Sequence, residues 1–232
     1  MRDGKLGALI PIRLSSERLP NKALREICGR PVVWHLLDRV CDSRHIKDKK
    51  DVVVCTTQDD ADTRLAESVE LYGCSVFRGE RDDIIKRFAD AMEHFNFDYV
   101  MQVDGDDPLT DTEYMDRTLD ELLAEPSHGI VVSEGLPLGI NSKSFSRAAM
   151  RVVLSRYRTV KNDTGFIYFF TKSGLFKKGI VRPARPEHVL DNARLTLDYA
   201  EDFMVFERIF EALYRPGKVF GLDEFIPFLK AN

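Results

Sequence analysis

The sequence predicts an α/β protein built on a doubly wound, mostly parallel sheet. Short β-rich runs alternate with longer segments of helical period through the first half of the chain. Three such β-then-α steps fall within about 100 residues, which implies right-handed crossovers. The strand candidates are buried runs, as expected when helices cover both faces of a parallel sheet.

The elements follow in order along the chain. Residues 32–41, for example, place Val33, Leu36, Leu37 and Val40 on one helical face. In the first half we predict strands at residues 6–11, 52–55, 75–77 and 99–103, and helices at residues 32–41, 60–71, 82–95 and 112–124. In the second half we predict strands at residues 130–133, 166–170 and 194–197, and helices at residues 145–157 and 200–214.

Length and composition indicate one globular domain. The 232 residues fit a single domain over residues 1–232, with an irregular insertion around residues 135–180. Apolar residues make up 44% of the chain and charged residues 31%, and the net charge of −4 favours neither nucleic acid nor an anionic membrane as a partner. The sequence contains no long apolar run and no Cys-x-x-Cys pair, so we expect a cytoplasmic protein.

The loop after the first strand carries the strongest chemical signal. In an open parallel sheet, ligands bind beyond the carboxyl ends of the strands. Three cations (Arg13, Arg18 and Lys22) and two hydroxyls follow the strand that ends at Pro11. Cationic side chains and free backbone N–H groups are what a chain of phosphates needs. The alternative is an ordinary solvated loop, and neither Gly-x-Gly-x-x-Gly nor Gly-Lys-Ser/Thr is present.

Carboxylates follow two other predicted strands. Asp104, Asp106 and Asp107 surround Gly105 after residues 99–103 and suit a hard cation such as Mg²⁺, although Asp and Gly before Pro108 also make a simple turn. Asp198 follows residues 194–197 and is either a second metal ligand or a helix N-cap. It would meet Asp106 only if the two strands are neighbours in the sheet.

Four separated motifs together resemble one enzyme family. Ile10-Pro11-Ile12-Arg13 with Arg18-Leu19-Pro20-Asn21-Lys22 and Gly29-Arg30-Pro31 resembles the opening of the cytidylyltransferases that make CMP-Kdo and CMP-sialic acid. The other three motifs resemble the spore-coat polysaccharide branch most: Phe77-Arg78-Gly79-Glu80-Arg81-Asp82-Asp83, Gly105-Asp106-Asp107-Pro108-Leu109, and Thr196-Leu197-Asp198-Tyr199-Ala200-Glu201-Asp202.

This resemblance implies a glycosyltransferase-A-like fold, dependence on Mg²⁺ and a homodimer formed through residues 135–180. It implies a reaction that joins CTP to a sugar acid (Kdo-like, amino-Kdo-like or nonulosonic) for cell-surface polysaccharide such as lipopolysaccharide. By position, the triphosphate would be bound by Arg13, Ser15, Arg18 and Lys22, with Pro11 beside them, and the metal by Asp106 and Asp198. Arg13, Lys22 and Asp106 are the predicted catalytic residues, and Asp104 would assist through a bound water.

The acceptor side of the resemblance is looser. Arg78 and Gly79 are candidates for the base or ribose, and Gln102, Asn141, Ser142, Asn162 and Asp163 for the acceptor. The chain departs from the spore-coat branch at Pro11-Ile12 and at Asp104, where the branch has Gln-Ala and Thr or Gln. The alternatives are a nucleotidyltransferase for another NTP or a polyol or sugar phosphate, a glycosyltransferase on a related fold, and a non-catalytic nucleotide-sensing domain.

Overall fold

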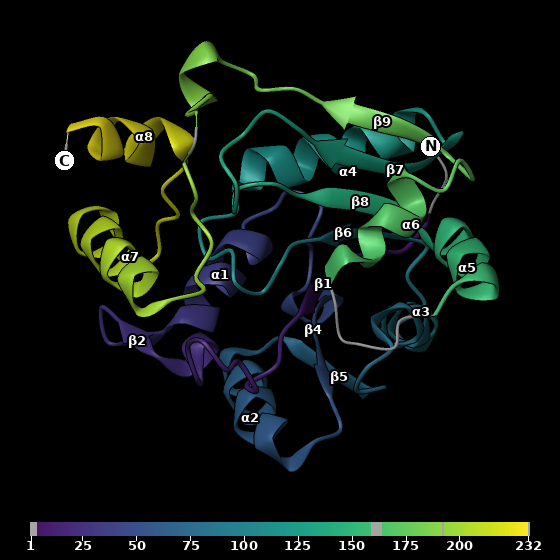
Figure 1. Cartoon of the computed structure of the whole chain (residues 1–232), viewed down its shortest axis with the longest axis horizontal. Helices are drawn as coiled ribbons and strands as arrows, with labels where there is room; N and C mark the ends of the chain where they lie inside the picture. Colours follow the sequence, from purple (N-terminus) through teal and green to yellow (C-terminus); the bar gives the residue numbers. More distant parts are fainter. Residues whose placement is uncertain (1–3, 159–163, 192, 232) are drawn as a thin grey trace.

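A computed structural model describes residues 4–158, 164–191 and 193–231 (Figure 1). Its strands are β1 (Leu6–Pro11), β2 (Glu26–Ile27), β3 (Arg30–Pro31), β4 (Val52–Thr57), β5 (Ser75–Gly79), β6 (Tyr99–Gln102), β7 (His128–Ser133), β8 (Lys143–Ser146) and β9 (Lys177–Val181). Its α-helices are α1 (Val32–Cys41), α2 (Thr63–Tyr72), α3 (Ile84–His94), α4 (Thr112–Ala124), α5 (Arg147–Arg156), α6 (Tyr168–Thr171), α7 (Ala200–Leu213) and α8 (Leu222–Ala231). Short 3-10 helices include η1 (Lys22–Leu24) and η3 (Asp60–Asp62).

The fold is α/β, with a mixed, mostly parallel sheet of seven strands in the order β5-β4-β1-β6-β8-β7-β9. Strands β5, β4, β1 and β6 are mutually parallel, and β7 is parallel to β9. Strand β8 runs antiparallel to both of its neighbours, β6 and β7. The carboxyl ends of β1, β4, β5 and β6 therefore lie along one edge, and the predicted site loops leave from there.

Two hydrophobic layers cover the sheet. Along β4, Val52 and Val54 belong to the core under α1, α2, α4, α7 and α8, whereas Val53 and Cys55 belong to the core under α3, α5 and α6. Successive side chains of a strand point to opposite faces, so a strand buried on both faces is apolar throughout. In Figure 1, α7 and α8 lie on one side of the sheet and α3 and α5 on the other.

Side-chain caps set the starts of several helices. The carboxylates of Asp83 and Asp111 accept hydrogen bonds from the backbone N–H groups of Lys86 and Glu113, and the Ser146 hydroxyl accepts one from Ala149 N. Each satisfies a donor that has no partner inside its helix. The Ser146 cap explains one error, because the predicted helix at residues 145–157 begins only at Arg147 and the preceding residues form β8.

The predicted aromatic strand at residues 166–170 is wrong. These residues form a 3-10 helix (Thr164–Ile167) followed by α6. Phe166 and Phe170 are each 1% exposed, and both pack in the core under α3 and α5. Two buried aromatic rings four residues apart share one face of a helix, and this spacing outweighs the strand preference of phenylalanine. The segment expected to be irregular also contributes β8 and β9 to the sheet.

The predicted strand at residues 194–197 is an extended segment with only an isolated bridge between Arg194 and Leu138. Its backbone bonds to loops: Leu195 N donates to Leu138 O at 2.7 Å, and Leu197 N donates to Asp106 O at 2.7 Å. Gly139 permits this approach, because a Cβ atom there would lie 2.1 Å from Leu195 O. The segment thus lies beside the loop after β6, although it adds no strand to the sheet.

None of the helices within the described ranges is long and apolar enough to cross a membrane.

Candidate active site

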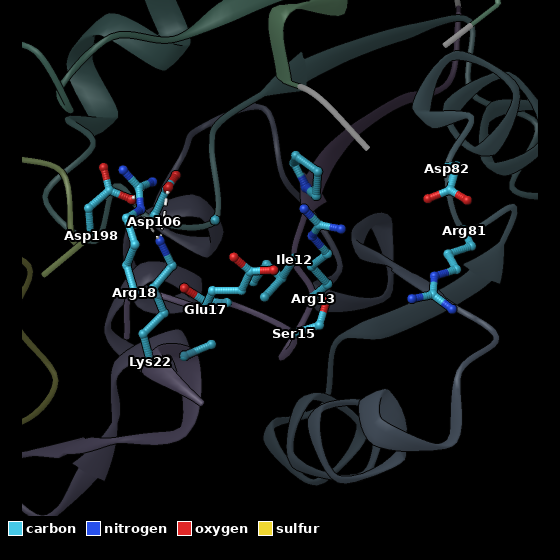
Figure 2. A pocket seen from close by; sticks show the side chains of 14 residues that line it. Ile12, Arg13, Ser15, Glu17, Arg18, Lys22, Arg81, Asp82, Asp106 and Asp198 are labelled. Atoms are coloured by element: carbon cyan, nitrogen blue, oxygen red, sulfur yellow. Dashed lines mark hydrogen bonds and ion pairs between the residues drawn. The ribbon is translucent and has the colours of Figure 1, made fainter. Parts of the chain in front are cut away.

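A cleft of about 770 Å³ opens at the carboxyl edge of the sheet (Figure 2). Its walls come from the loops that follow β1, β5 and β6, from η1, and from Asp198, which lies two residues before α7. The lining residues are Pro11, Ile12, Arg13, Ser15, Ser16, Glu17, Arg18, Lys22, Ala23, Arg81, Asp82, Gly105, Asp106 and Asp198. Of the predicted residues, the structure brings together Pro11, Arg13, Ser15, Arg18, Lys22, Asp106 and Asp198.

The loop after β1 holds its cations toward solvent by burying its leucines. Leu14 is 6% exposed and Leu19 is 2% exposed, whereas Arg13 and Arg18 are exposed. Leu14 N donates to Asp62 Oδ1 at 2.8 Å, and the other oxygen of this buried carboxylate accepts from the Thr57 hydroxyl at 2.5 Å. The end of β4 thereby anchors the loop. Asp62 was absent from the sequence-based candidates, because a carboxylate in a helical run gives no sign of its distant partner.

Gly105 allows the loop after β6 to lie against the end of β1. A Cβ atom on this residue would lie 2.3 Å from Ile12 Cγ1 and 2.5 Å from Pro11 O. Real Cβ atoms do not approach other heavy atoms so closely, so only glycine permits this contact. The close approach brings Asp106 beside the cationic loop.

Lys22 links the two predicted metal ligands. Its Nζ atom donates to Asp106 Oδ2 at 3.1 Å, to Asp198 Oδ1 at 3.3 Å and to Leu197 O at 2.6 Å. Figure 2 shows the lysine reaching from η1 toward both carboxylates. Asp106 and Asp198 thus meet at one point, although the residues before Asp198 form no strand of the sheet.

Asp198 does not cap α7. The N-cap residue is Tyr199, and Asp202 performs the capping by accepting hydrogen bonds from Asp198 N and Tyr199 N, both at 2.8 Å. The Asp198 carboxylate instead accepts from Arg18 at 2.8 Å and from Arg194 at 3.4 Å. The predicted capping role of Asp198 is therefore wrong, and its carboxylate faces the cleft.

Asp104 lies behind the cleft in a second charged cluster. Its carboxylate accepts from Lys143 Nζ at 2.6 Å and from Gln102 Nε2 at 2.9 Å. Burial opposes the charge of Lys143, but the attraction of Asp104, Asp107 and Asp106 raises its pKa. Burial, together with the charges of Asp104 and Asp106, raises the pKa of Asp107 well above its ordinary value. The carboxylates after β6 thus crowd one another and need cationic partners.

The other predicted residues do not line the cleft. Arg78 donates to Thr57 O at 3.0 Å and to Asp59 O at 2.7 Å, which ties β5 to the loop after β4. Gly79 lies against Arg87, while Gln102 and Ser142 are each 0% exposed. Asn141 Nδ2 donates to Pro137 O at 3.2 Å. Asn162 and Asp163 lie outside the residues that the structure describes.

Arg81 and Asp82 are lining residues that the sequence reasoning missed. They form the wall of the cleft opposite Asp198 in Figure 2, and Arg81 Nε lies 3.4 Å from Asp59 Oδ2. Both belong to the Phe77–Asp83 motif, so the motif contains the signal, although the residues predicted from it are Arg78 and Gly79. Arg78 and Gly79 belong to the end of β5, whereas Arg81 and Asp82 lie in the loop after it. The sequence did not show where this strand ends.

Two carboxylates that converge on one cation fit a magnesium-like ion. Mg²⁺ is bound in proteins through one or two carboxylates, with water and substrate phosphates completing its shell. Within the described part of the chain, no group of three or more His, Cys, Asp or Glu residues is placed to hold a metal. Asp106 and Asp198 are therefore suited to share a hard cation with a phosphate, and not to enclose one alone.

The chain is similar to a known protein family over most of its length. The family model described as cytidylyltransferase matches residues 8–194, which include three of the four sequence motifs. A protein of uncharacterized function from Methanocaldococcus jannaschii is 28% identical over 204 residues, with 87% of this chain and 82% of the relative covered. The 3-deoxy-manno-octulosonate cytidylyltransferase of Hahella chejuensis is 33% identical over 172 residues, with 71% of this chain covered. The chain spans about 60% of the length of that relative.

Solved structures match over nearly the whole chain. A cytidylyltransferase from Leptospira borgpetersenii has a TM-score of 0.85 at 25% identity, with 98% of this chain and 94% of that chain covered. A CMP:2-keto-3-deoxy-manno-octonic acid synthetase complexed with CTP has a TM-score of 0.66 at 14% identity, over 90% of this chain and 99% of that chain. A Mycobacterium tuberculosis protein in complex with manganese has a TM-score of 0.61 at 17% identity, over 88% and 98%. By its family match, the chain belongs to the cytidylyltransferase family of nucleotidyltransferases.

Proposed function

We propose that this member of the cytidylyltransferase family joins CTP to a hydroxyl of a sugar acid, releasing pyrophosphate and a CMP-sugar. The single observation that carries the proposal is the meeting of the cationic loop after β1 with Asp106 and Asp198 in one cleft. Phosphoryl-type transfer requires positioning and charge stabilisation rather than a protein nucleophile. The cleft offers both kinds of charge within one cavity.

The loop after β1 would bind the triphosphate of CTP. Arg13 is exposed, and it forms no ion pair among the residues that the structure describes, so its guanidinium is available to an anion. Guanidinium groups bind phosphate oxygens through two parallel hydrogen bonds. Arg13, Arg18 and Lys22 would offset the charge that develops on the departing pyrophosphate, with Ser15 as a further donor.

A divalent metal, Mg²⁺ or Mn²⁺, would be held by Asp106 and Asp198. Such a metal polarises phosphate oxygens and lowers the pKa of a nearby hydroxyl. The donor set on these residues supports this assignment, and a relative of the same fold is known in complex with manganese. Asp104, held by Lys143 and Gln102, would orient the loop that carries Asp106.

The acceptor is assigned by relationship. Curated relatives that are 31–33% identical over more than two thirds of this chain act on 3-deoxy-manno-octulosonate, so we infer an octulosonic or related sugar acid. The spore-coat branch is proposed from the motifs alone. Gln102 and Ser142 are each 0% exposed and lie too deep to contact the acceptor without movement. Asn141 is half-buried and donates to the Pro137 carbonyl, and Arg78 is engaged by backbone carbonyls. A homodimer through residues 135–180 is part of the same proposal.

The test is pyrophosphate release by the full chain in the presence of Mg²⁺. Each of the four NTPs is paired with 3-deoxy-manno-octulosonate, its amino analogue, a nonulosonic acid and a polyol phosphate. We expect release only with CTP and one of the acids, with a CMP-sugar identified by mass spectrometry. Release with a different NTP, or only with the polyol phosphate, would refute the assignment of substrates.

A pair of variants tests the residues. Asp106→Asn removes a charge from the cleft and should lower the rate by about 100-fold or more. Glu70→Gln removes one carboxylate from an exposed position of α2 and should leave the rate unchanged. If Asp106→Asn keeps a rate within a few-fold of the parent, Asp106 has no part in catalysis.

A further inference from the structure

The ammonium group of Lys22 is predicted to bind the triphosphate, but protein oxygens already accept its hydrogen bonds. An ammonium group has three N–H donors, and those of Lys22 contact Asp106, Asp198 and the Leu197 carbonyl. The side chain is only 15% exposed. Lys22 therefore cannot bind a phosphate without leaving at least one of these partners.

The Nζ atom of Lys22 lies where a metal ion shared by Asp106 and Asp198 would lie. Two carboxylates from distant parts of the chain, Asp106 and Asp198, point at its Nζ atom from 3.1 and 3.3 Å. Like charges this close repel, and a cation between them is what makes the arrangement stable. A peptide carbonyl oxygen, Leu197 O, completes a set of three oxygens around the lysine nitrogen.

The charges around this point already cancel. Three cations and three carboxylates form one connected network through ion pairs of 2.7 to 3.4 Å: Arg18, Lys22 and Arg194 with Asp106, Asp198 and Asp202. A divalent cation that entered alone would add uncompensated positive charge. A nucleoside triphosphate carries more negative charge than one divalent metal neutralises, so the two together would suit the network better.

We propose that Lys22 is an internal counter-ion that holds Asp106 and Asp198 together and excludes a divalent cation until a nucleotide arrives. The proposal rests on the proposed function. The triphosphate draws the ammonium of Lys22 onto its phosphate oxygens, and Asp106 and Asp198 are thereby released to the metal. Arg18 makes the same exchange, from Asp198 and the Tyr199 hydroxyl to phosphate. Metal and nucleotide then bind cooperatively. The nucleotide removes Lys22 from the carboxylates that the metal needs, and the metal removes the carboxylates that hold Lys22 away from phosphate.

The distinguishing consequence is that one substitution has opposite effects on two ligands. Lys22→Gln removes the competing charge, so the affinity for Mn²⁺ in the absence of nucleotide should rise by about tenfold or more. The same substitution removes a phosphate ligand, so the affinity for CTP should fall. A lysine that only binds phosphate would lower the second affinity without raising the first.

The experiment measures free Mn²⁺ by electron paramagnetic resonance during titration of the full chain, with no nucleotide or acceptor present. Lys22→Arg retains the charge and should bind Mn²⁺ as weakly as the parent. Arg25→Gln is the matched control, because it removes one charge three residues away from Lys22, at an exposed position. CTP affinity is measured separately by calorimetry, and thermal unfolding checks that each variant is folded.

The proposal is overturned if folded Lys22→Gln binds Mn²⁺ no more tightly than the parent, or if Arg25→Gln gains as much as Lys22→Gln. If Lys22→Gln does not fold, Lys22→Met keeps the apolar stem of the side chain and takes its place in the same titration. Because the titration contains no CTP and no sugar acid, its result does not depend on which acceptor the enzyme uses. If the variants bind Mn²⁺ as expected but the activity assay fails, only the proposed substrates are refuted.

Discussion

Replacing Gly105 by alanine should move the loop that carries Asp106 away from the end of β1. The added Cβ atom would lie 2.3 Å from Ile12 Cγ1 and 2.5 Å from the Pro11 carbonyl oxygen. Carbon atoms in contact lie about 3.5–4.0 Å apart, so the loop must retreat by roughly 1 Å. Pro11 O belongs to the backbone of a central strand and cannot move aside. The loop that carries Asp106 must therefore give way.

The retreat sets the expected size of the effect. A displacement of about 1 Å at a reacting group can lower a rate by 10²-fold. Overpacking typically costs about 1–3 kcal/mol of the free energy of unfolding. For a chain of this length, each kcal/mol lowers the melting temperature by about 2–4 °C. Gly105→Ala should therefore remain folded at room temperature while it loses most of its activity.

The assay compares pyrophosphate release and thermal unfolding for Gly105→Ala and for a control, Gly221→Ala. A Cβ atom at Gly221 would lie 3.4 Å from Asp111 Oδ2, which is an ordinary contact, and Gly221 does not line the cleft. The control should keep its rate. A Gly105→Ala enzyme with a rate within threefold of the parent would refute the argument that close approach of this loop positions Asp106.

Three further outcomes follow from particular residues. Asp202→Asn weakens the carboxylate that accepts from Asp198 N and binds Arg194, so kcat should fall by about tenfold at an unchanged KM for CTP, measured by steady-state pyrophosphate release. Burial lowers the pKa of His35 below its ordinary value of 6.5, although its contact with the Ile27 carbonyl opposes the shift. As the pH falls, His35 of the unfolded chain therefore binds a proton before His35 of the folded chain does. Stability should accordingly fall as the pH drops through 6.5, by up to about 1.4 kcal/mol per pH unit, and His35→Gln should flatten this slope in urea titrations at pH 7.5 and 5.5. Phe88→Ala empties a 0% exposed site beside Phe166 and should cost about 3–5 kcal/mol, read from the urea midpoint; a loss under 1 kcal/mol would contradict tight packing there.

Local pattern was sufficient for most of the first half of the fold. The strand at Leu6–Pro11 and the helices at Val32–Cys41 and Thr112–Ala124 have the bounds that their periodicity predicts. Each of these elements buries apolar residues at its own characteristic spacing, so hydrophobic burial and local preference agree. Where they disagree, as at Phe166 and Phe170, packing against α3 and α5 decided the structure.

Strands with few apolar residues escaped prediction. Lys143–Ser146 contains a lysine and two serines, and Lys177–Val181 contains two lysines and a glycine. They become strands because neighbouring strands supply their hydrogen bonds. The antiparallel insertion of β8 between β6 and β7 has no local signature of any kind. This insertion also places Lys143 opposite Gln102 and hence beside Asp104.

The sequence by itself determined the chemical types present in the cleft. Motif order placed cations after the first strand and carboxylates after the fourth, because ligand-binding loops follow the carboxyl ends of parallel strands. Only the tertiary structure decided how these groups pair. Asp106 and Asp198 lie 92 positions apart, and they meet because Gly105 and Gly139 let two loops approach backbones that any side chain would hold away. Their common partner, Lys22, follows from that approach, since two carboxylates brought together need a cation between them.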